Sequence, residues 1–431
     1  MANVDKSEIN LTVSKGEIVG ITGRNGSGKT TFARYLAGEI RPETMGMVHI
    51  NGLDTYSQLD REKVQRMSAV AYQSPREAMV FDNISRDIIF GSENHGLDAE
   101  KTLKRGSFYL KKYNLRSRKN ASYYSVSASE QQRAMLCSML IMHPELLILD
   151  EPFSMHGSPD VTGYVKSLIA AARKKEQTVI IFSKNPDVLK LTDVTYELSG
   201  GFLREVDISS FDYLPKQEGV KTIYGDKTPK GVAVERYIDG GRGKNDIGIS
   251  LHNVSFGYNE NLIIDRVNTR FEAGSAYRIT GGQGSGKTTF LMLAAGLIRP
   301  YEGEVFRSEN TRIGYVYEYP DDGFVESTVL DDVMFGPMKG GFGKSEARGM
   351  AEAVLGFVGL DKSLWTRRLS TLSFGERKLV GVAGAICLNP DFLLIDNPYA
   401  GLDRDYCKHM SDIFEGLTRE GKCIITAENR A

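Results

Sequence analysis

The stretch Gly23-Arg24-Asn25-Gly26-Ser27-Gly28-Lys29-Thr30 decides the fold, because it matches the pattern Gly-x-x-x-x-Gly-Lys-Ser/Thr of a phosphate-binding loop. It follows a strand-like run at residues 17–22 and precedes an apolar helical pattern at residues 32–37. Glycines let backbone N–H groups converge on phosphate oxygens, and the helix N-terminus adds its positive end. We therefore predict a nucleotide site in which Lys29 reaches the β- and γ-phosphates and Thr30 places its hydroxyl on Mg²⁺.

A second copy of this loop, Gly281-Gly282-Gln283-Gly284-Ser285-Gly286-Lys287-Thr288, begins 258 residues after the first. The same offset, without a gap, aligns Asn268 with Asn10. Apolar runs at residues 146–149 and 392–395 are typical of buried parallel strands, and helical stretches alternate with such runs in each half. The sequence therefore predicts an α/β fold with two tandem phosphate-loop domains, each built on a mainly parallel sheet.

The repeat also sets the expected boundaries. Residues 1–207 form the predicted first domain, and residues 247–431 form the second. Residues 208–246 between them are polar and loop-like, which indicates a linker with room for some strand content.

Composition restricts the functional classes. With 54 Lys and Arg against 55 Asp and Glu in 431 residues, the formal charge is −1, so no global field favours nucleic acid or an anionic membrane. The four cysteines stand singly in apolar segments, which fits a reducing compartment. The N-terminus has no signal-peptide pattern, and the longest weakly apolar run, residues 379–388, is too short to span a bilayer. Any membrane role is therefore expected to come through a separate partner chain.

Three further motifs follow each loop in the same order. The first half has Ala71-Tyr72-Gln73-Ser74-Pro75, then Val126-Ser127-Ala128-Ser129-Glu130, then Leu149-Asp150-Glu151-Pro152. The second half has Val316-Tyr317-Glu318-Tyr319-Pro320, then Leu372-Ser373-Phe374-Gly375-Glu376, then Ile395-Asp396-Asn397-Pro398. The chain thereby resembles the ATP-binding-cassette (ABC) ATPase family over nearly its whole length. That resemblance implies ATP and Mg²⁺ as cofactors and a helical subdomain in each half.

A narrower resemblance concerns residues 329–337, Val-Leu-Asp-Asp-Val-Met-Phe-Gly-Pro, which are similar to a segment of the energy-coupling-factor importers. Those importers take up vitamins and transition-metal ions, and some carry two fused ATPase halves without membrane segments. The resemblance implies a cytoplasmic subunit, peripheral on the inner membrane face, that energises integral transporter subunits on a separate chain. No nucleic acid is expected as a partner, and the solute is not encoded in this chain.

The family resemblance implies roles for individual residues. Asp150 would hold Mg²⁺, Glu151 would polarise the attacking water, and Gln73 would sense Mg²⁺ and the γ-phosphate. Family members pair head to tail, and the two halves are expected to pair in this way within the chain. The expected metal-site residues are Thr30, Gln73, Asp150, Thr288 and Asp396. The expected ATP-binding residues are Gly23, Asn25, Gly26, Ser27, Gly28, Lys29, Thr30, Thr31, Ser127, Tyr258, Gly281, Gln283, Gly284, Ser285, Gly286, Lys287, Thr288, Thr289, Ser373, Gly375, Asn397 and Asp403.

Departures from the family pattern concentrate in one site. The first site, with the loop at Lys29, is expected to face Ser373, Gly375 and Asp403, and Phe374 replaces a glycine of the facing segment.

In the second site, with the loop at Lys287, Asn397 replaces the catalytic glutamate and Glu318 replaces the glutamine. Its facing segment has Ser129 where the family has glycine, and that side chain crowds a close backbone approach. An asparagine orients a water but hardly accepts its proton. We predict that the first site hydrolyses ATP slowly, while the second binds nucleotide and holds the halves closed.

The family's switch histidine aligns with Lys184 in the first half and with Asn429 in the second. Lys184 could donate to the γ-phosphate as a point charge, or it could be a solvated lysine at a strand end. Whether the chain hydrolyses ATP slowly or not at all therefore stays open. Two other functions stay open as well: a nucleotide-gated assembly protein with little turnover, and a soluble ABC ATPase that acts on ribosomes or DNA.

The ends of the repeat differ between the halves. Tyr258, expected to stack on adenine, lies 29 residues before Lys287, and the same count back from Lys29 reaches position zero. The first half is thus expected to lack that strand. Ala431 aligns with Pro186, so the second half is expected to lack the counterpart of residues 187–206.

Overall fold

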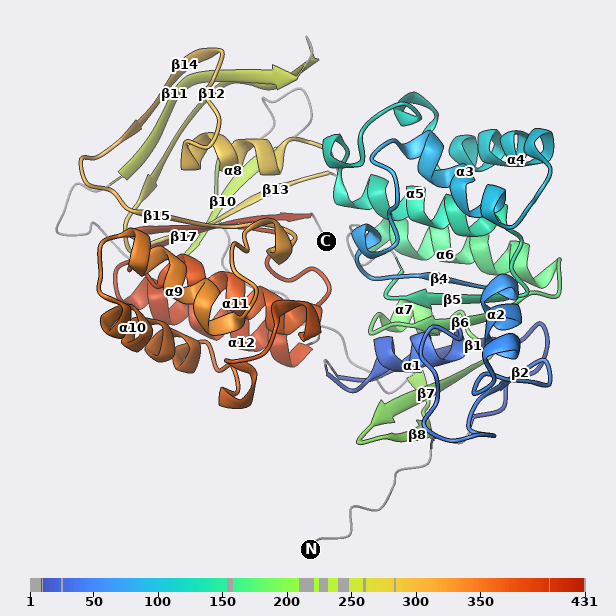
Figure 1. Cartoon of the computed structure of the whole chain (residues 1–431). Coiled ribbons are helices and arrows are strands. Elements are labelled where there is room, and N and C mark those ends of the chain that lie inside the picture. Colours follow the sequence, from blue (N-terminus) through green and yellow to red (C-terminus); the bar gives the residue numbers. More distant parts are fainter. Residues whose placement is uncertain are drawn as a thin grey trace, which may run out of the picture. The chain divides into compact units, whose positions relative to one another are not determined.

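The computed structural model describes residues 9, 11–24, 26–152, 158–208, 221–224, 232–238, 248–258, 261–282, 284–402 and 404–429. The chain divides into two compact units, Met1–Tyr213 and Leu214–Ala431 (Figure 1). Three residues expected in the ATP sites, Asn25, Gln283 and Asp403, lie outside the described part. Among the described residues, no helix is long and apolar enough to cross a membrane.

The first unit is a mainly parallel sheet with helices on both faces. Its helices and strands are β1 (Ile18–Thr22), α1 (Lys29–Leu36), β2 (His49–Ile50), β3 (Leu53–Asp54), α2 (Gln58–Met67), β4 (Ser68–Ala71), α3 (Ile84–Asn94), α4 (Ala99–Lys112), α5 (Ala128–Ile141), β5 (Leu146–Asp150), α6 (Ser158–Arg173), β6 (Thr178–Phe182), α7 (Pro186–Leu189), β7 (Val194–Ser199) and β8 (Phe202–Glu205). The sheet order is β4-β5-β6-β1-β7-β8, and only β7 and β8 pair antiparallel.

Alternation along the strands divides the core of this unit. On β5, Leu147 and Leu149 belong to the cluster formed with α3–α6, whereas Leu146 and Ile148 belong to the cluster formed with α1. Figure 1 shows β4, β5 and β6 between α6 and α1. A strand buried on both faces is apolar throughout, which is why the run at residues 146–149 is a reliable strand signal.

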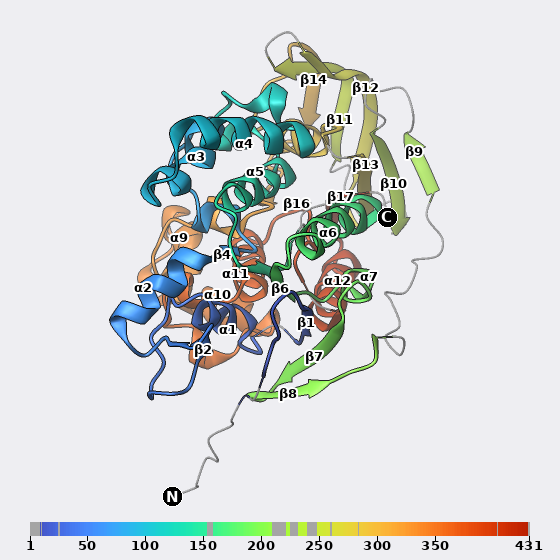
Figure 2. The same cartoon turned by 90° about the vertical axis from the view of Figure 1, so that its right-hand side faces the viewer.

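The second unit repeats this plan and adds a small antiparallel sheet. Its helices and strands are β9 (Lys221–Tyr224), β10 (Ala233–Ile238), β11 (Gly248–Tyr258), β12 (Asn261–Glu272), β13 (Ala276–Gly281), α8 (Lys287–Ala295), β14 (Glu302–Arg307), β15 (Ile313–Val316), α9 (Val329–Lys339), α10 (Lys344–Phe357), α11 (Phe374–Ile386), β16 (Phe392–Asp396), α12 (Arg404–Arg419) and β17 (Cys423–Asn429). The main sheet has the order β15-β16-β17-β13-β10-β9, and the small one β12-β11-β14. Figure 1 shows α8 on one face of the main sheet, and Figures 1 and 2 show α9–α12 on the other. The predicted α/β fold is confirmed in both units.

The two sheets complete their last edge in different ways. In the first unit β7 follows β6 in the chain and pairs parallel with β1. In the second unit β10 precedes the phosphate loop and pairs antiparallel with β13, and β9 continues the edge. Both β9 and β10 come from within residues 208–246, the segment predicted as a linker. Val234 of β10 is fully buried in the core, so this strand is an integral part of the second unit.

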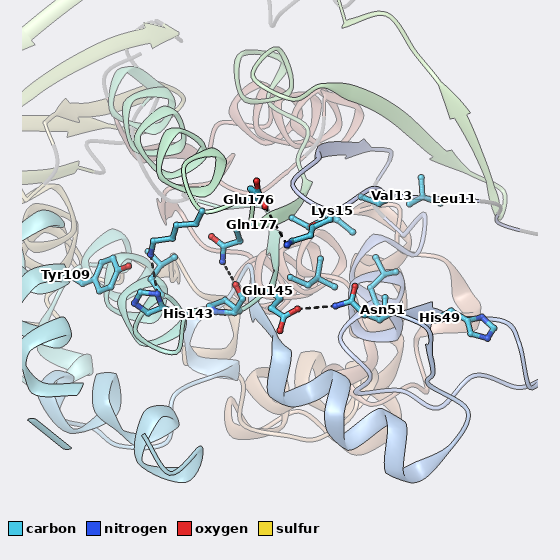
Figure 3. A pocket seen from close by; sticks show the side chains of 18 residues that line it. Leu11, Val13, Lys15, His49, Asn51, Tyr109, His143, Glu145, Glu176 and Gln177 are labelled. Atoms are coloured by element: carbon cyan, nitrogen blue, oxygen red, sulfur yellow. Dashed lines mark hydrogen bonds and ion pairs between the residues drawn. The ribbon is translucent and has the colours of Figure 1, made fainter. Parts of the chain in front are cut away.

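A cavity of about 780 Å³ lies beside the amino-terminal ends of β5 and β6 in the first unit (Figure 3). Its lining includes Val13 and Leu146. The residues at the corresponding positions of the second unit are Phe271 and Phe392, and both are fully buried. Two buried rings thus occupy, in the second core, the positions at which the first unit has smaller side chains beside its cavity.

Candidate functional site

Both phosphate loops lie at the carboxyl ends of the parallel strands. In the first unit β1 ends at Thr22 immediately before the loop, and β5 and β6 end beside it at Asp150 and Phe182. Ligands of open α/β sheets bind at this end, because the loops that follow parallel strands meet there. The cavity of Figure 3 lies at the opposite end and contains none of the predicted site residues.

The first loop is folded around its own lysine. Lys29 Nζ donates to the carbonyl oxygens of Gly23 and Arg24, at 2.6 and 2.9 Å. A Cβ atom at Gly23 would lie 2.5 Å from a backbone oxygen, and Gly28 has φ +94°, so both positions require glycine. Ser27 Oγ is buried and has no hydrogen-bond partner among the residues that the structure describes. An unpaired buried hydroxyl beside converging N–H groups fits a phosphate oxygen that this loop would bind.

The metal-site residues also come together. Thr30 Oγ1 donates to Asp150 Oδ2 at 2.6 Å, and Asp150 is almost fully buried. A hydroxyl and a carboxylate are the hard oxygen ligands that Mg²⁺ prefers. Within the described residues, no cluster of three or more His, Cys, Asp and Glu side chains could hold a metal ion. The donor set therefore fits a Mg²⁺ that takes its remaining ligands from nucleotide phosphates and water.

Glu151 stands next to Asp150 in a strained conformation. Its φ is +49°, a region that a non-glycine residue adopts rarely. Its N–H donates to the Phe182 carbonyl at 2.8 Å, which ties it to the end of β6. The Lys184 N–H donates to Glu151 Oε2 at 3.4 Å, and Lys184 Nζ lies 3.9 Å from Oε1. The Lys184 side chain is only 16% exposed, so it is directed at the carboxylate rather than at solvent.

Gln73 and Ser127 lie in segments that α5 holds in place. Gln132 Nε2 on α5 donates to the Gln73 carbonyl at 3.2 Å. Ser127 caps α5 in a capping box with Glu130, and the buried Ser129 hydroxyl has no hydrogen-bond partner within the described part of the chain. Gly26 lies within the first phosphate loop, and Thr31 follows it directly.

The second loop has the same internal contacts as the first. Lys287 Nζ donates to the carbonyl oxygens of Gly281 and Gly282, at 3.0 and 2.9 Å. Thr288 Oγ1 donates to Asp396 Oδ2 at 2.6 Å. Gly286 has φ +102°, and burial lowers the pKa of Lys287. The remaining loop residues with a predicted role are Gly284, Ser285 and Thr289.

The residues around the second loop differ from those of the first. Asn397 has φ +47°, close to the value at Glu151, and its Nδ2 donates to Glu318 Oε1 at 2.8 Å. Lys378 Nζ, from the interior of α11, donates to the Asn397 carbonyl. Burial lowers the pKa of Lys378 to about 8, and burial together with the Glu318 charge raises the pKa of Asp396.

Lys378 was not among the residues predicted from sequence. It lies five residues after Ser373, and the corresponding residue of the first half is Gln132. A lysine immediately before the apolar run Leu379–Val380, where the other half has a neutral amide, was the available signal. Its side chain is 1% exposed, which only the packed structure shows.

The other predicted residues occupy positions within the second unit. Ser373 caps α11 in a capping box with Glu376, and Gly375 is buried in the first turn. Tyr258 is 47% exposed and packs edge-on against Phe256, with ring centroids 5.0 Å apart. An exposed ring at a strand end is available for stacking on a base.

Comparisons with known proteins agree with these motifs. The sequence profile of the ABC transporter family matches residues 7–154 and 264–400. An ABC transporter ATP-binding protein, so named, from Methanosarcina mazei is 28% identical over 97% of this chain and 85% of its own length. A protein of Clostridium perfringens with the same name is 25% identical over 97% of this chain and 82% of its length. The resemblance found in the sequence is therefore confirmed.

Solved structures support the fold alone. The archaeal ABCE1 in a ribosome-bound complex with Pelota has a TM-score of 0.63 and 19% identity, over 97% of this chain and 70% of that one. An archaeal ribosome recycling factor in complex with a stalk protein has a TM-score of 0.56 and 19% identity, over 97% and 81%. With two phosphate loops of matching geometry and a family profile that covers both units, the chain belongs to the ABC transporter family, as an ATP-hydrolysing enzyme with two ABC domains.

Proposed function

We propose that this chain is the ATPase subunit of an energy-coupling-factor-type importer, with one catalytic and one nucleotide-retaining site. The observation that carries the asymmetry is the residue after the metal-site aspartate. It is a carboxylate at Glu151 and an amide at Asn397, on backbones with nearly the same left-handed φ. The transport role is supported by the names of relatives that span almost the whole chain.

In this proposal the first site performs hydrolysis by positioning and electrostatics. Lys29 leaves the loop carbonyls for the phosphates, and Thr30 and Asp150 hold Mg²⁺, which supplies charge neutralisation when bound. Glu151 orients the attacking water and accepts its proton. Lys184, which contacts Glu151 in this structure, donates to the γ-phosphate in place of the family's histidine.

We further propose that the two halves pair head to tail, as the family resemblance implies. The segment with Ser373 and Gly375 then completes the first site, and the segment with Ser127 completes the second. Closure on ATP moves cytoplasmic segments of membrane partners docked near Gln73 and Glu318. The solute is a vitamin or a metal ion chosen by those partners, and the chain acts at the inner face of the cell membrane.

The test is to tag the chain, purify it from its own host in mild detergent and identify the proteins that accompany it. A polytopic membrane protein in stoichiometric amount is the expected result. Ribosomal proteins, nucleic acid or no partner at all would overturn the importer assignment. A Lys29→Ala/Lys287→Ala chain serves as control, since it keeps the docking surface while both loops lose their phosphate ligand.

A second candidate is a nucleotide-gated assembly protein that barely hydrolyses ATP. The contact between Lys184 and Glu151 favours it, because a carboxylate paired with an ammonium is less available to orient an attacking water. Single-turnover measurement of phosphate release decides between the two. Release no faster than in a Glu151→Gln chain identifies the assembly protein.

A further inference from the structure

Three positions of the repeat carry different side-chain chemistry in the two halves. Glu151 corresponds to Asn397, and Gln73 corresponds to Glu318, so a carboxylate and an amide have changed places. The third position changes from Gln132 to Lys378. The three second-unit residues come from the loop after β15, from the end of β16 and from α11, and the structure brings them into contact.

The exchange keeps the formal charge of each site. The first site combines Lys29 and Lys184 with Asp150 and Glu151, and its sum is zero. The second site has two lysines and two carboxylates as well; they are Lys287, Lys378, Asp396 and Glu318. Only the placement differs. The extra lysine lies at the switch position in the first site and is buried inside α11 in the second.

Burial of Lys378 calls for a nearby negative charge. An ammonium that is 1% exposed is strongly destabilising unless anions and hydrogen bonds compensate it. Lys378 donates to the Asn397 carbonyl and lies 5.7 Å from the centroid of the Phe374 ring. Glu318 and Asp396 are the carboxylates whose charges act on it most strongly. The lysine therefore accounts for how two carboxylates are accommodated beside Thr288.

Glu318 is held in place by its neighbours in the second unit. Its Oε1 accepts from the Asn397 amide, and a buried ammonium is close by. An anionic oxygen binds Mg²⁺ more strongly than the neutral amide oxygen of a glutamine does.

We propose that Glu318 is a second anionic ligand of the nucleotide's Mg²⁺ in the second site, and that Lys378 is the positioning residue that neutralises and fixes it. This inference rests on the proposed role of the second site as the nucleotide-retaining one, and it supplies a physical cause for that retention. The second site holds its divalent cation, and with it the nucleotide, more tightly than the first site does.

The chain itself provides the matched variant. Glu318→Gln/Lys378→Gln installs the pair that the first half has at these positions, Gln73 and Gln132, and leaves no uncompensated buried charge. The reverse variant, Gln73→Glu/Gln132→Lys, gives the first half the charges of the second. In each case Lys→Ala in the other loop, at Lys29 or at Lys287, leaves one loop to bind nucleotide.

The experiment titrates Mn²⁺ into each variant with ATP and follows free Mn²⁺ by electron paramagnetic resonance. The Glu318→Gln/Lys378→Gln chain should bind Mn²⁺ about tenfold more weakly than its Lys29→Ala parent, and the reverse variant should bind more tightly than its Lys287→Ala parent. Unchanged Mn²⁺ affinity in both variants would overturn the inference. The titration needs no membrane partner, so its outcome is independent of the co-purification that tests the transport role.

Discussion

The two phosphate loops agree in their internal contacts and differ in the residue proposed to act on the attacking water. Lys29 and Lys287 each donate to two carbonyls of their own loop, and each loop threonine lies 2.6 Å from an aspartate. The residue after that aspartate is glutamate in one site and asparagine in the other. The loop geometry is thus repeated while the carboxylate is not, and under the proposed function this difference separates nucleotide binding from cleavage.

The backbone conformation at these two residues supports the same distinction. Glu151 and Asn397 have φ of +49° and +47°. Asparagine adopts this left-handed conformation readily, whereas glutamate does not. The first site therefore keeps a glutamate at a strained position where an asparagine is the easier choice, and strain retained in this way is typical of a catalytic group.

The largest effect on ATP turnover is expected from substitution of Glu151, and a much smaller one from substitution of Asn397. Glu151→Gln should lower ATP turnover by about 10²–10⁴-fold, because it removes the general base and keeps the shape. Asn397→Ala should lower turnover by a few-fold at most, since the amide carries no proton-accepting role. Phosphate release by the purified chain with its partner is the measurement. An unchanged rate in the first variant with a lost rate in the second would show that the sites had been assigned in reverse.

The next prediction restores the missing carboxylate. Asn397→Glu should lower the free energy of unfolding of the second unit by about 1–3 kcal/mol, since it places a third carboxylate beside Glu318 and Asp396 at a positive φ. Adding Glu318→Gln should recover most of the loss. Trp365 is the only tryptophan of the chain, so its fluorescence in a urea titration reports this unit.

A double variant as unstable as the single one would contradict the exchange of charges. Gln73→Glu beside the native Glu151 is the control in the first unit. It creates the same crowding of carboxylates there, with Lys184 rather than Lys378 as the nearby cation.

The fold and the positions of the two phosphate loops could be predicted from sequence because their signals are local. The phosphate loops fix a strand, a turn and a helix within a few residues, and the runs at 146–149 and 392–395 each fix a buried strand. The sequence predicted no strand order; the sheets confirm the α/β class.

The features that sequence did not predict depend on partners distant in the chain. Val234 lies in a segment whose composition is that of a loop, and β10 forms a strand because β13 pairs with it. Lys378 is chemically unremarkable until α11 packs it against the end of β16. The cavity beside Leu146 is lined by residues at positions that no motif marks.

A smaller effect is expected where the two sites differ in their contact with the adenine ring of ATP. Tyr258→Ala should weaken ATP binding at the second loop by roughly fivefold, because stacking on a partly exposed ring contributes about 1 kcal/mol. The first loop should be unaffected. Fluorescent nucleotide titrations of Lys29→Ala and Lys287→Ala chains, each with and without the tyrosine, measure the two loops separately. Equal weakening at both loops would rule out a role specific to the second one.

The smallest effect concerns the two cores. Val13→Phe places in the first unit the ring that Phe271 supplies in the second, where the corresponding space is filled. The change should stabilise the first unit by about 0.5–1 kcal/mol, because burying apolar surface in an existing hollow gains transfer energy without displacing a packed neighbour. Slower amide hydrogen exchange in β6 is the expected observation, and Phe271→Val should speed exchange in β17. Polar contacts line the cavity, among them Lys175 with His143 and Asn51 with Glu145 (Figure 3). If Val13→Phe instead speeds exchange in β6, these contacts keep the cavity walls apart and the phenyl ring cannot be accommodated. The hollow would then be a built feature of the first unit rather than a consequence of smaller side chains.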